Sequence, residues 1–222
     1  NPGIKKRFHQ EVIDELKRKE SGSVADVIEL HIKEHGKTLV TLAELASLTA
    51  LSADEIKEAA QELRGQGLIY TFELKKDTWM WHADSRREAQ QEILEALTAY
   101  ETKYPYRYGM KKAEVQGIYF QKIKPNLFDK VIELLEEEGC VKREGEFLCT
   151  PGFEVRKDGT YEKVSAVLLN TFEKARFDFV RYSEIELPGV DRGTGDDILN
   201  ILLVEGAVVK VTDDMYTLKS YM

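Results

Sequence analysis

Two histidines and a glutamate lie close together near the start of the chain. His31, Glu34 and His35 match the pattern H-x-x-E-H, which one class of zinc proteases uses. Residues four apart on a helix face the same way, so both imidazoles could bind one Zn²⁺. Histidines also suit the last turn of a helix that ends at Gly36, because they favour the negative end of the helix dipole. No neighbouring segment supplies a third ligand, so we expect a helix end and no metal site.

A glycine-rich stretch, GVDRGTG, spans residues 189–195. A phosphate-binding loop would continue with Gly-Lys-Ser/Thr, whereas this stretch is followed by two aspartates, which repel phosphate. We expect a turn in which Thr194 caps the last helix together with Asp197. The remaining histidines, His9 and His82, complete no Ser/His/Asp arrangement. We therefore expect no catalytic residue, no bound cofactor and no enzyme activity in this chain.

Two cysteines, Cys140 and Cys149, fall on the two arms of one expected hairpin. Two thiols without further cysteine or histidine companions make neither a metal site nor a disulfide framework. We interpret them as reduced residues of a cytoplasmic protein.

Basic and aromatic side chains are interleaved between residues 103 and 130. This segment contains seven basic and two acidic residues, so its net charge is +5, whereas the net charge of the whole chain is −8. Such a surface could contact an RNA backbone and stack on exposed bases. Alternatively, the tyrosines pack the domain and the lysines only solvate its surface. The candidate RNA- or ribosome-contact residues are Arg107, Lys111, Lys112, Lys122, Lys124 and Lys130.

Composition limits what the whole chain can bind. The 222 residues include 40 acidic and 32 basic side chains, and this balance argues against affinity of the whole molecule for nucleic acid. No run approaches the roughly 18 apolar residues that span a bilayer, so we expect no membrane segment. The first residues lack an initiator methionine and an apolar signal region, so we expect a fragment of a longer protein.

Three glycines mark three copies of one unit. Gly67, Gly139 and Gly206 are 72 and 67 residues apart. Each follows a helix-like segment and precedes two short strand-like segments joined by a polar turn. Such glycines can adopt the left-handed conformation that ends a helix. Similar periods of this length suggest tandem copies of one small domain.

Two further helical segments precede each of these helices, so each copy has three helices followed by a β-hairpin. This order is typical of a winged helix, and it predicts a mainly α chain with small β-hairpins (α+β) and tandem winged-helix domains. Capping boxes at Ser52–Glu55 and Ser85–Glu88 mark two of the helix starts. We expect a connecting helix over 1–21 and winged helices over 22–84, 85–151 and 152–222.

The third helix of a winged helix commonly enters the major groove of DNA. In the first copy this helix carries Asp54, Glu55, Glu58 and Glu62, and in the third copy it carries Asp196 and Asp197. Contact with phosphates requires Lys or Arg, so both faces are poorly suited to nucleic acid.

The second copy carries a more specific pattern. Residues 104–115 read YPYRYGMKKAEV and residues 127–135 read LFDKVIELL, with Pro151-Gly152-Phe153 after the hairpin. This ordered set resembles the C-terminal extension of the bacterial selenocysteine-specific elongation factor, SelB. There, a "YP-x-x-x-GM" entry leads to a basic helix and then to a "lfd-x-ll-x-L-x-x-eG" helix. The specific motif covers the second copy, whereas the order of modules covers nearly the whole chain.

The resemblance implies a fragment of the C-terminal arm of a translation factor. The fragment would be a non-catalytic spacer between a GTPase body and the tip that binds the SECIS hairpin of the mRNA. That family reads the hairpin with its fourth, last winged helix, and we expect this chain to stop after the third. GTP would bind to the missing N-terminal part. The implied partners of the full-length factor are the ribosome, SECIS mRNA and selenocysteinyl-tRNA, with little specific RNA binding by the fragment, which we expect to be monomeric.

Two other classes stay open. An acidic winged-helix scaffold within a protein complex would bind a stable protein partner. A DNA-binding winged-helix regulator would be retained on duplex DNA at about 0.15 M salt. The acidic third helices argue against this class.

Overall fold

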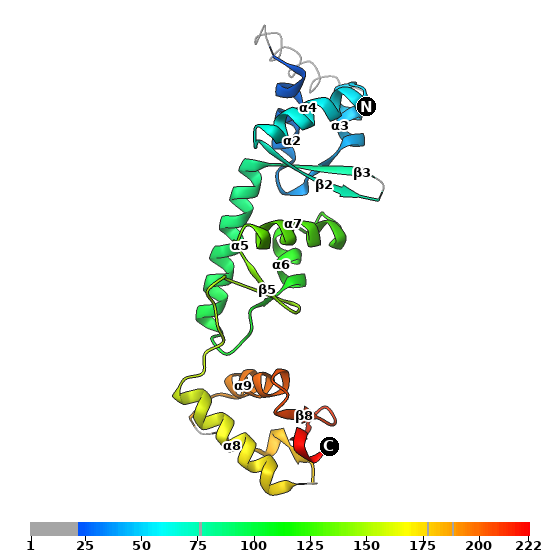
Figure 1. The fold of residues 1–222 in the computed structure, drawn as a ribbon. Coiled ribbons are helices and arrows are strands. Elements are labelled where there is room, and N and C mark those ends of the chain that lie inside the picture. Colours follow the sequence, from blue (N-terminus) through cyan, green and yellow to red (C-terminus); the bar gives the residue numbers. More distant parts are fainter. Residues whose placement is uncertain (1–21, 76, 177, 188) are drawn as a thin grey trace, which may run out of the picture. The chain divides into compact units, whose positions relative to one another are not determined.

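The computed structural model describes residues 22–222 except 76, 177 and 188, so the connecting helix expected over 1–21 lies outside the described residues. Within that part, one order of elements occurs three times along the chain (Figure 1). We call the three stretches the first, second and third modules. The first contains α2 (Val24–His35), η1 (Gly36–Thr38), β1 (Val40–Thr41), α3 (Leu42–Thr49), α4 (Ala53–Gly65), β2 (Ile69–Leu74) and β3 (Asp77–His82).

The second module repeats this order without the 3-10 turn, and in the third a 3-10 turn, η2 (Tyr182–Glu184), takes the place of the expected second helix. The second contains α5 (Ala83–Lys103), β4 (Met110–Lys111), α6 (Lys112–Tyr119), α7 (Pro125–Glu137), β5 (Lys142–Glu144) and β6 (Phe147–Cys149). The third contains α8 (Gly159–Ala175), β7 (Val180–Arg181), η2 (Tyr182–Glu184), α9 (Arg192–Val204), β8 (Val208–Lys210), β9 (Met215–Leu218) and η3 (Lys219–Tyr221).

Each module has a small antiparallel sheet of three strands. The orders are β1-β3-β2, β4-β6-β5 and β7-β9-β8, so the last strand is always central. The predicted class, helices with small sheets in tandem winged helices, is confirmed. The hairpins were predicted, but the short first strands β1, β4 and β7 were not, because two residues carry too little alternation to be recognised. None of the helices that the structure describes is both long and apolar enough to cross a membrane.

Local capping chemistry explains where the helices begin and end. The Ser52 side chain accepts a hydrogen bond from the Glu55 backbone, and the Glu55 carboxylate accepts one from the Ser52 backbone, as predicted. The same reciprocal box starts α2 and α3. After α4, α7 and α9 the chain turns at Gly67, Gly139 and Gly206, where φ is +73°, +68° and +73°. Glycine adopts this conformation without steric cost, so the predicted stops are confirmed.

Three local predictions were wrong. Helix α5 begins at Ala83, so Ser85 lies buried inside its first turn and does not start it. The expected cap of α9 was Thr194. The cap is instead Asp191, whose carboxylate accepts a hydrogen bond from the Thr194 backbone (3.0 Å). Cys140 precedes strand β5 and is therefore not on a hairpin arm.

The chain divides into two compact units. One comprises Asn1–Glu95, as far as it is described, with Ala113–Cys140, and the other comprises Ala96–Lys112 with Val141–Met222. In the first unit, Ile28 and Ile32 of α2, Ile56 and Leu63 of α4 and Met80 of β3 form a buried core. The expected bounds of the three winged helices, 22–84, 85–151 and 152–222, therefore stay a prediction.

The second unit has a core of its own within the third module. It is built by α8, α9 and strand β9, and the side chain of Tyr106 from the second module belongs to it. Its buried residues include Leu168, Phe172, Ile198, Leu202 and Tyr216.

Candidate functional sites at the module junctions

The candidate zinc motif lies at a helix end. His35 lies in the last turn of α2 and His31 one turn earlier, with His35 Nδ1 at 2.7 Å from the His31 carbonyl oxygen. His31 Nδ1 lies 3.6 Å from the Glu34 carboxylate. Within the described residues, no three His, Cys, Asp or Glu side chains form a group that could hold a metal ion.

The glycine-rich stretch before α9 allows close packing. A Cβ atom on Gly195 would lie 2.1 Å from Leu187 Cδ1 and 2.7 Å from the Tyr182 hydroxyl oxygen. Arg192 lies over the Tyr182 ring, with 4.6 Å between the guanidinium carbon and the ring centroid. It donates hydrogen bonds to the carbonyl oxygens of Tyr182 (3.1 Å) and Ser183 (2.8 Å). The glycine and the arginine thus fix the turn between η2 and α9.

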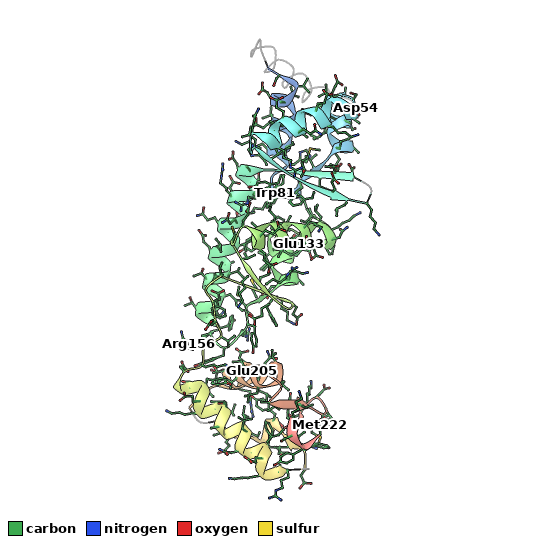
Figure 2. All side chains as sticks on the ribbon, in the orientation of Figure 1. Asp54, Trp81, Glu133, Arg156, Glu205 and Met222 are labelled. Carbon is green, nitrogen blue, oxygen red and sulfur yellow. The ribbon has the colours of Figure 1, made fainter. Side chains whose placement is uncertain are left out.

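In the first unit, the sheet of the first module is apolar on both faces. Met80 and Ile69 face the core of the first module, whereas Trp81 points to the opposite face. The Trp81 ring is fully buried and meets the edge of the Phe120 ring, with 6.0 Å between centroids and 75° between planes. Phe120 in turn contacts Phe128 of α7 at 5.4 Å. Trp81 is labelled in Figure 2 on the side of the sheet that faces α7.

Charged side chains surround this aromatic contact. Arg86 of α5 is buried, pairs with Glu138 and lies over the Tyr70 ring at 5.7 Å. The Tyr70 hydroxyl donates a hydrogen bond to the same Glu138 carboxylate (3.3 Å). The wing of the first module is therefore packed against α5 and the end of α7. We call this set of contacts the first junction.

Lys37 adds a second polar contact to the first junction. Its ammonium group pairs with Glu92 of α5 and lies 5.8 Å from the centroid of the Tyr119 ring of α6. One side chain from the first module thus engages two helices of the second. Nearby, Lys33 pairs with Asp84 at 2.7 Å, and this carboxylate holds the pKa of Lys33 above its ordinary value.

The second unit contains a corresponding second junction, centred on Arg107. Its Nε donates a hydrogen bond to the Asp197 carboxylate of α9 (2.8 Å), and Nη1 donates one to the Tyr100 hydroxyl (3.2 Å). The guanidinium carbon lies 4.0 Å from the centroid of the Tyr104 ring. Burial alone would lower the pKa of Arg107, but its hydrogen bonds and the Asp197 charge raise it, so the guanidinium stays charged.

Tyr106 extends the second junction to the start of α8. It is buried in the core of the third module, and its hydroxyl donates a hydrogen bond to Asp158 (2.9 Å). Asp158 is the N-cap of α8 and accepts from the backbone of Thr160 and Tyr161. Burial would raise the pKa of Asp158, but these hydrogen bonds hold it below its ordinary value. A side chain from the second module therefore completes the cap of a helix in the third.

The chain between the modules is also held. The Arg156 backbone donates a hydrogen bond to the Pro105 carbonyl oxygen (2.9 Å), and Thr150 Oγ1 donates to the Glu101 carboxylate (2.8 Å). Lys157 pairs with Glu205 at 2.5 Å, and both Arg156 and Glu205 are labelled in Figure 2. The second junction thus combines an ion pair, aromatic packing and backbone hydrogen bonds.

The six candidate RNA-contact residues do not form one group in the structure. Arg107 lies in the second junction, and Lys130 pairs with Glu133 at 2.5 Å. Lys111 is exposed on strand β4, and Lys112 is half-buried at the start of α6. Lys122 and Lys124 are exposed between α6 and α7 in the first unit. Their contact with RNA or the ribosome stays a prediction.

The junction residues were not predicted from the sequence. Sequence position alone places Arg107 among the basic residues of the candidate RNA patch and Asp197 on a helix poorly suited to nucleic acid. A usable signal was strand β3, TWMWH, whose residues are apolar on both faces of a short strand. A strand that is buried on both faces needs two packing partners. The core of its own module covers one face of β3, so the other face has to pack against another module.

Comparisons with known proteins agree with the resemblance found in the sequence. Residues 94–148 match the family model described as "Elongation factor SelB, winged helix". The chain is 24% identical over 224 residues to the selenocysteine-specific elongation factor of Desulfomicrobium baculatum. That alignment covers 100% of this chain and 35% of the relative, so the chain spans about a third of the length of the protein it matches. The predicted resemblance to the SelB winged-helix extension is thereby confirmed.

Proposed function

We propose that this chain, which carries SelB-type winged helices, is the spacer part of the C-terminal arm of a selenocysteine-specific elongation factor. The spacer links a GTPase body, which would bind GTP outside this chain, to a tip that binds the SECIS hairpin of the mRNA. In that context the partners of the full-length factor are the ribosome, SECIS mRNA and selenocysteinyl-tRNA. The factor acts in the cytoplasm, and this part of it is monomeric and non-catalytic.

The observation that carries the proposal is the pair of junctions. In each unit, buried aromatic rings and ion pairs join residues of one module to residues of the next. A chain of domains used for independent binding events does not need such contacts, because flexible linkers suffice. A spacer needs them, since fixed interfaces convert the size of each module into a set distance.

The helices that would read nucleic acid also favour a spacer. In α4, the side chains of Asp54, Glu58 and Glu62 are exposed and acidic. In α9, Asp197 is held by Arg107 in the second junction. The wing of the first module is occupied by the first junction. These surfaces are poorly suited to phosphate, which favours a spacer over a DNA-binding regulator.

Binding of a labelled SECIS hairpin tests the proposal. We expect the 222-residue chain to bind the cognate hairpin no better than a hairpin with a scrambled loop. Binding of both RNAs should disappear at about 0.15 M salt. Tight, salt-resistant and loop-specific binding would show that this chain itself reads the hairpin. Stable capture of a single protein partner without ribosome association would favour the scaffold alternative.

A further inference from the structure

The turn between α6 and α7 presents two lysines without an acidic partner. Lys122 and Lys124 are both exposed, and within the described part of the chain neither forms an ion pair. They flank Ile123, whose side chain is buried with 5% exposure. Because the middle residue points into the protein, the two lysines are directed to solvent on either side of it. We define Lys122 and Lys124 as the basic turn.

The basic turn is held in one conformation. The Ile123 backbone donates a hydrogen bond to the Phe120 carbonyl oxygen (3.2 Å), and the Gln116 side chain donates one to the Ile123 carbonyl oxygen (3.1 Å). Phe120 itself is fixed between Trp81 and Phe128. The lysine backbones are therefore ordered before any ligand binds, which lowers the entropic cost of binding.

The charged side chains at the two ends of α7 are arranged opposite to the arrangement that the helix dipole stabilises. Helices prefer acidic side chains at the first turn and basic ones at the last. Here Lys124 is the N-cap residue, with no capping hydrogen bond from its side chain, whereas the last turn contains Glu136 and Glu137. At the acidic end, Glu138 is compensated by Arg86. The lysines at the basic end have no such compensation within the described residues.

From the two exposed lysines, their fixed turn and this uncompensated charge, we propose that the basic turn docks the phosphodiester backbone of RNA. The choice of RNA over other polyanions rests on the proposed function in translation. Residues two apart lie about 5–7 Å from each other, so both ammonium groups can reach neighbouring phosphates of one strand. The exposed side chain of Ile118 and the exposed Gln121 lie on the preceding turn and complete the surface.

The contact is expected to be independent of base sequence. Side chains cannot read the deep, narrow major groove of A-form RNA, and lysine ammonium groups are matched to its phosphates. Two phosphate contacts give weak binding in isolation, and their effect depends strongly on salt. Within a factor already held on the ribosome, such a contact would steady the arm because its effective concentration is high.

Fluorescence anisotropy with the full chain and a labelled 20-base-pair RNA duplex of arbitrary sequence tests the proposal. The double variant Lys122→Glu, Lys124→Glu should bind at least about tenfold more weakly at 50 mM KCl, and its salt slope should fall by about 2. The matched control is Lys163→Glu, Lys174→Glu, two exposed lysines of α8, which changes the net charge by the same amount. We expect the control to lose less than about threefold.

Equal losses in the two variants would overturn the proposal, because the whole-molecule charge would then explain binding. An unchanged affinity of the basic-turn variant, or no binding by the wild-type chain, would also overturn it. A photo-crosslinker attached at Lys122→Cys in a Cys140→Ser background, so that only the new thiol is labelled, and mixed with ribosomes gives an independent measurement. Crosslinks to ribosomal RNA support the proposal, whereas crosslinks to protein alone contradict it. The spacer proposal is unaffected by either result, since it depends on the junctions and on hairpin binding.

Discussion

At the scale of single residues, Arg107 has the most connections in the second junction. It joins Asp197 of α9 to the rings of Tyr100 and Tyr104, so one side chain links the two modules by charge and by stacking. Arginine suits this position because its planar guanidinium can donate several hydrogen bonds while stacking on an aromatic ring. Lysine could not replace it without losing at least one of these contacts.

We predict that Arg107→Ala lowers the free energy of unfolding by about 1–2 kcal/mol. Arg107 keeps 37% of its side chain exposed, so solvent screening limits the effect. Urea unfolding of the wild type, Arg107→Ala, Asp197→Ala and the double variant measures the coupling, which should be about 1 kcal/mol. Arg181→Ala is the control, because its ion pair with Glu184 is exposed and 4.0 Å long. Additive effects of the two junction substitutions would contradict this account.

The two thiols differ in their environment. Cys149 is fully buried in β6, and burial raises its pKa to about 11 from an ordinary value of 9.0, whereas Cys140 is half-exposed. We predict that iodoacetamide at pH 8 modifies Cys140 quickly and Cys149 only after unfolding, because the thiolate is the reactive form. Peptide mass spectrometry measures both rates. Equal rates in the native protein would be inconsistent with the buried site.

The raised pKa of Cys149 also affects stability at alkaline pH. The unfolded thiol ionises at pH values where the native thiol is still protonated, so ionisation favours the unfolded state. The stabilising contribution is complete below pH 9 and is lost as the pH rises toward about 11. Cys149→Ala should reduce this part of the pH dependence, as measured by urea unfolding between pH 8 and 11.

At the scale of secondary-structure elements, the sheet of the first module is the main packing element of the first junction. Its one face covers the core of the first module, and Trp81 on the other face meets Phe120. A wing used in this way holds neighbouring helices in place and is not available to contact a nucleic-acid groove.

We predict that Phe120→Ala destabilises the protein by about 3–5 kcal/mol, because it removes a buried ring and leaves a cavity. Tryptophan fluorescence during urea unfolding reports the change, since Trp81 contacts this ring. Ile118→Ala, two residues away and 51% exposed, is the matched control and should cost at most about 0.5 kcal/mol. Similar effects of both substitutions would show that the aromatic contact does not hold the junction.

The elements could be predicted largely from local sequence chemistry. The Ser52–Glu55 box and the glycine stops at Gly67, Gly139 and Gly206 gave correct helix ends, because capping depends on neighbouring residues. The two-residue strands could not be predicted, since their pairing partners lie about 40 residues away. For the same reason the ion pair between Arg107 and Asp197, 90 residues apart, could not be read from spacing.

At the scale of the whole molecule, each compact unit contains one junction, and each unit mixes residues of two modules. Along the chain, the assignment to units changes inside the second module, after Glu95, Lys112 and Cys140, and not between modules. One part of the second module thus packs with the first module, and the rest packs with the third.

The most direct test of the spacer account is the distance distribution between two spin labels in the second unit. Ala99 of α5 and Asn170 of α8 are exposed positions from neighbouring modules, and Cys140→Ser with Cys149→Ala removes the native thiols. Double electron–electron resonance should give one narrow distribution, which broadens when Arg107→Ala and Tyr106→Phe release the second junction. A distribution that is already as broad in the intact junction would contradict the account.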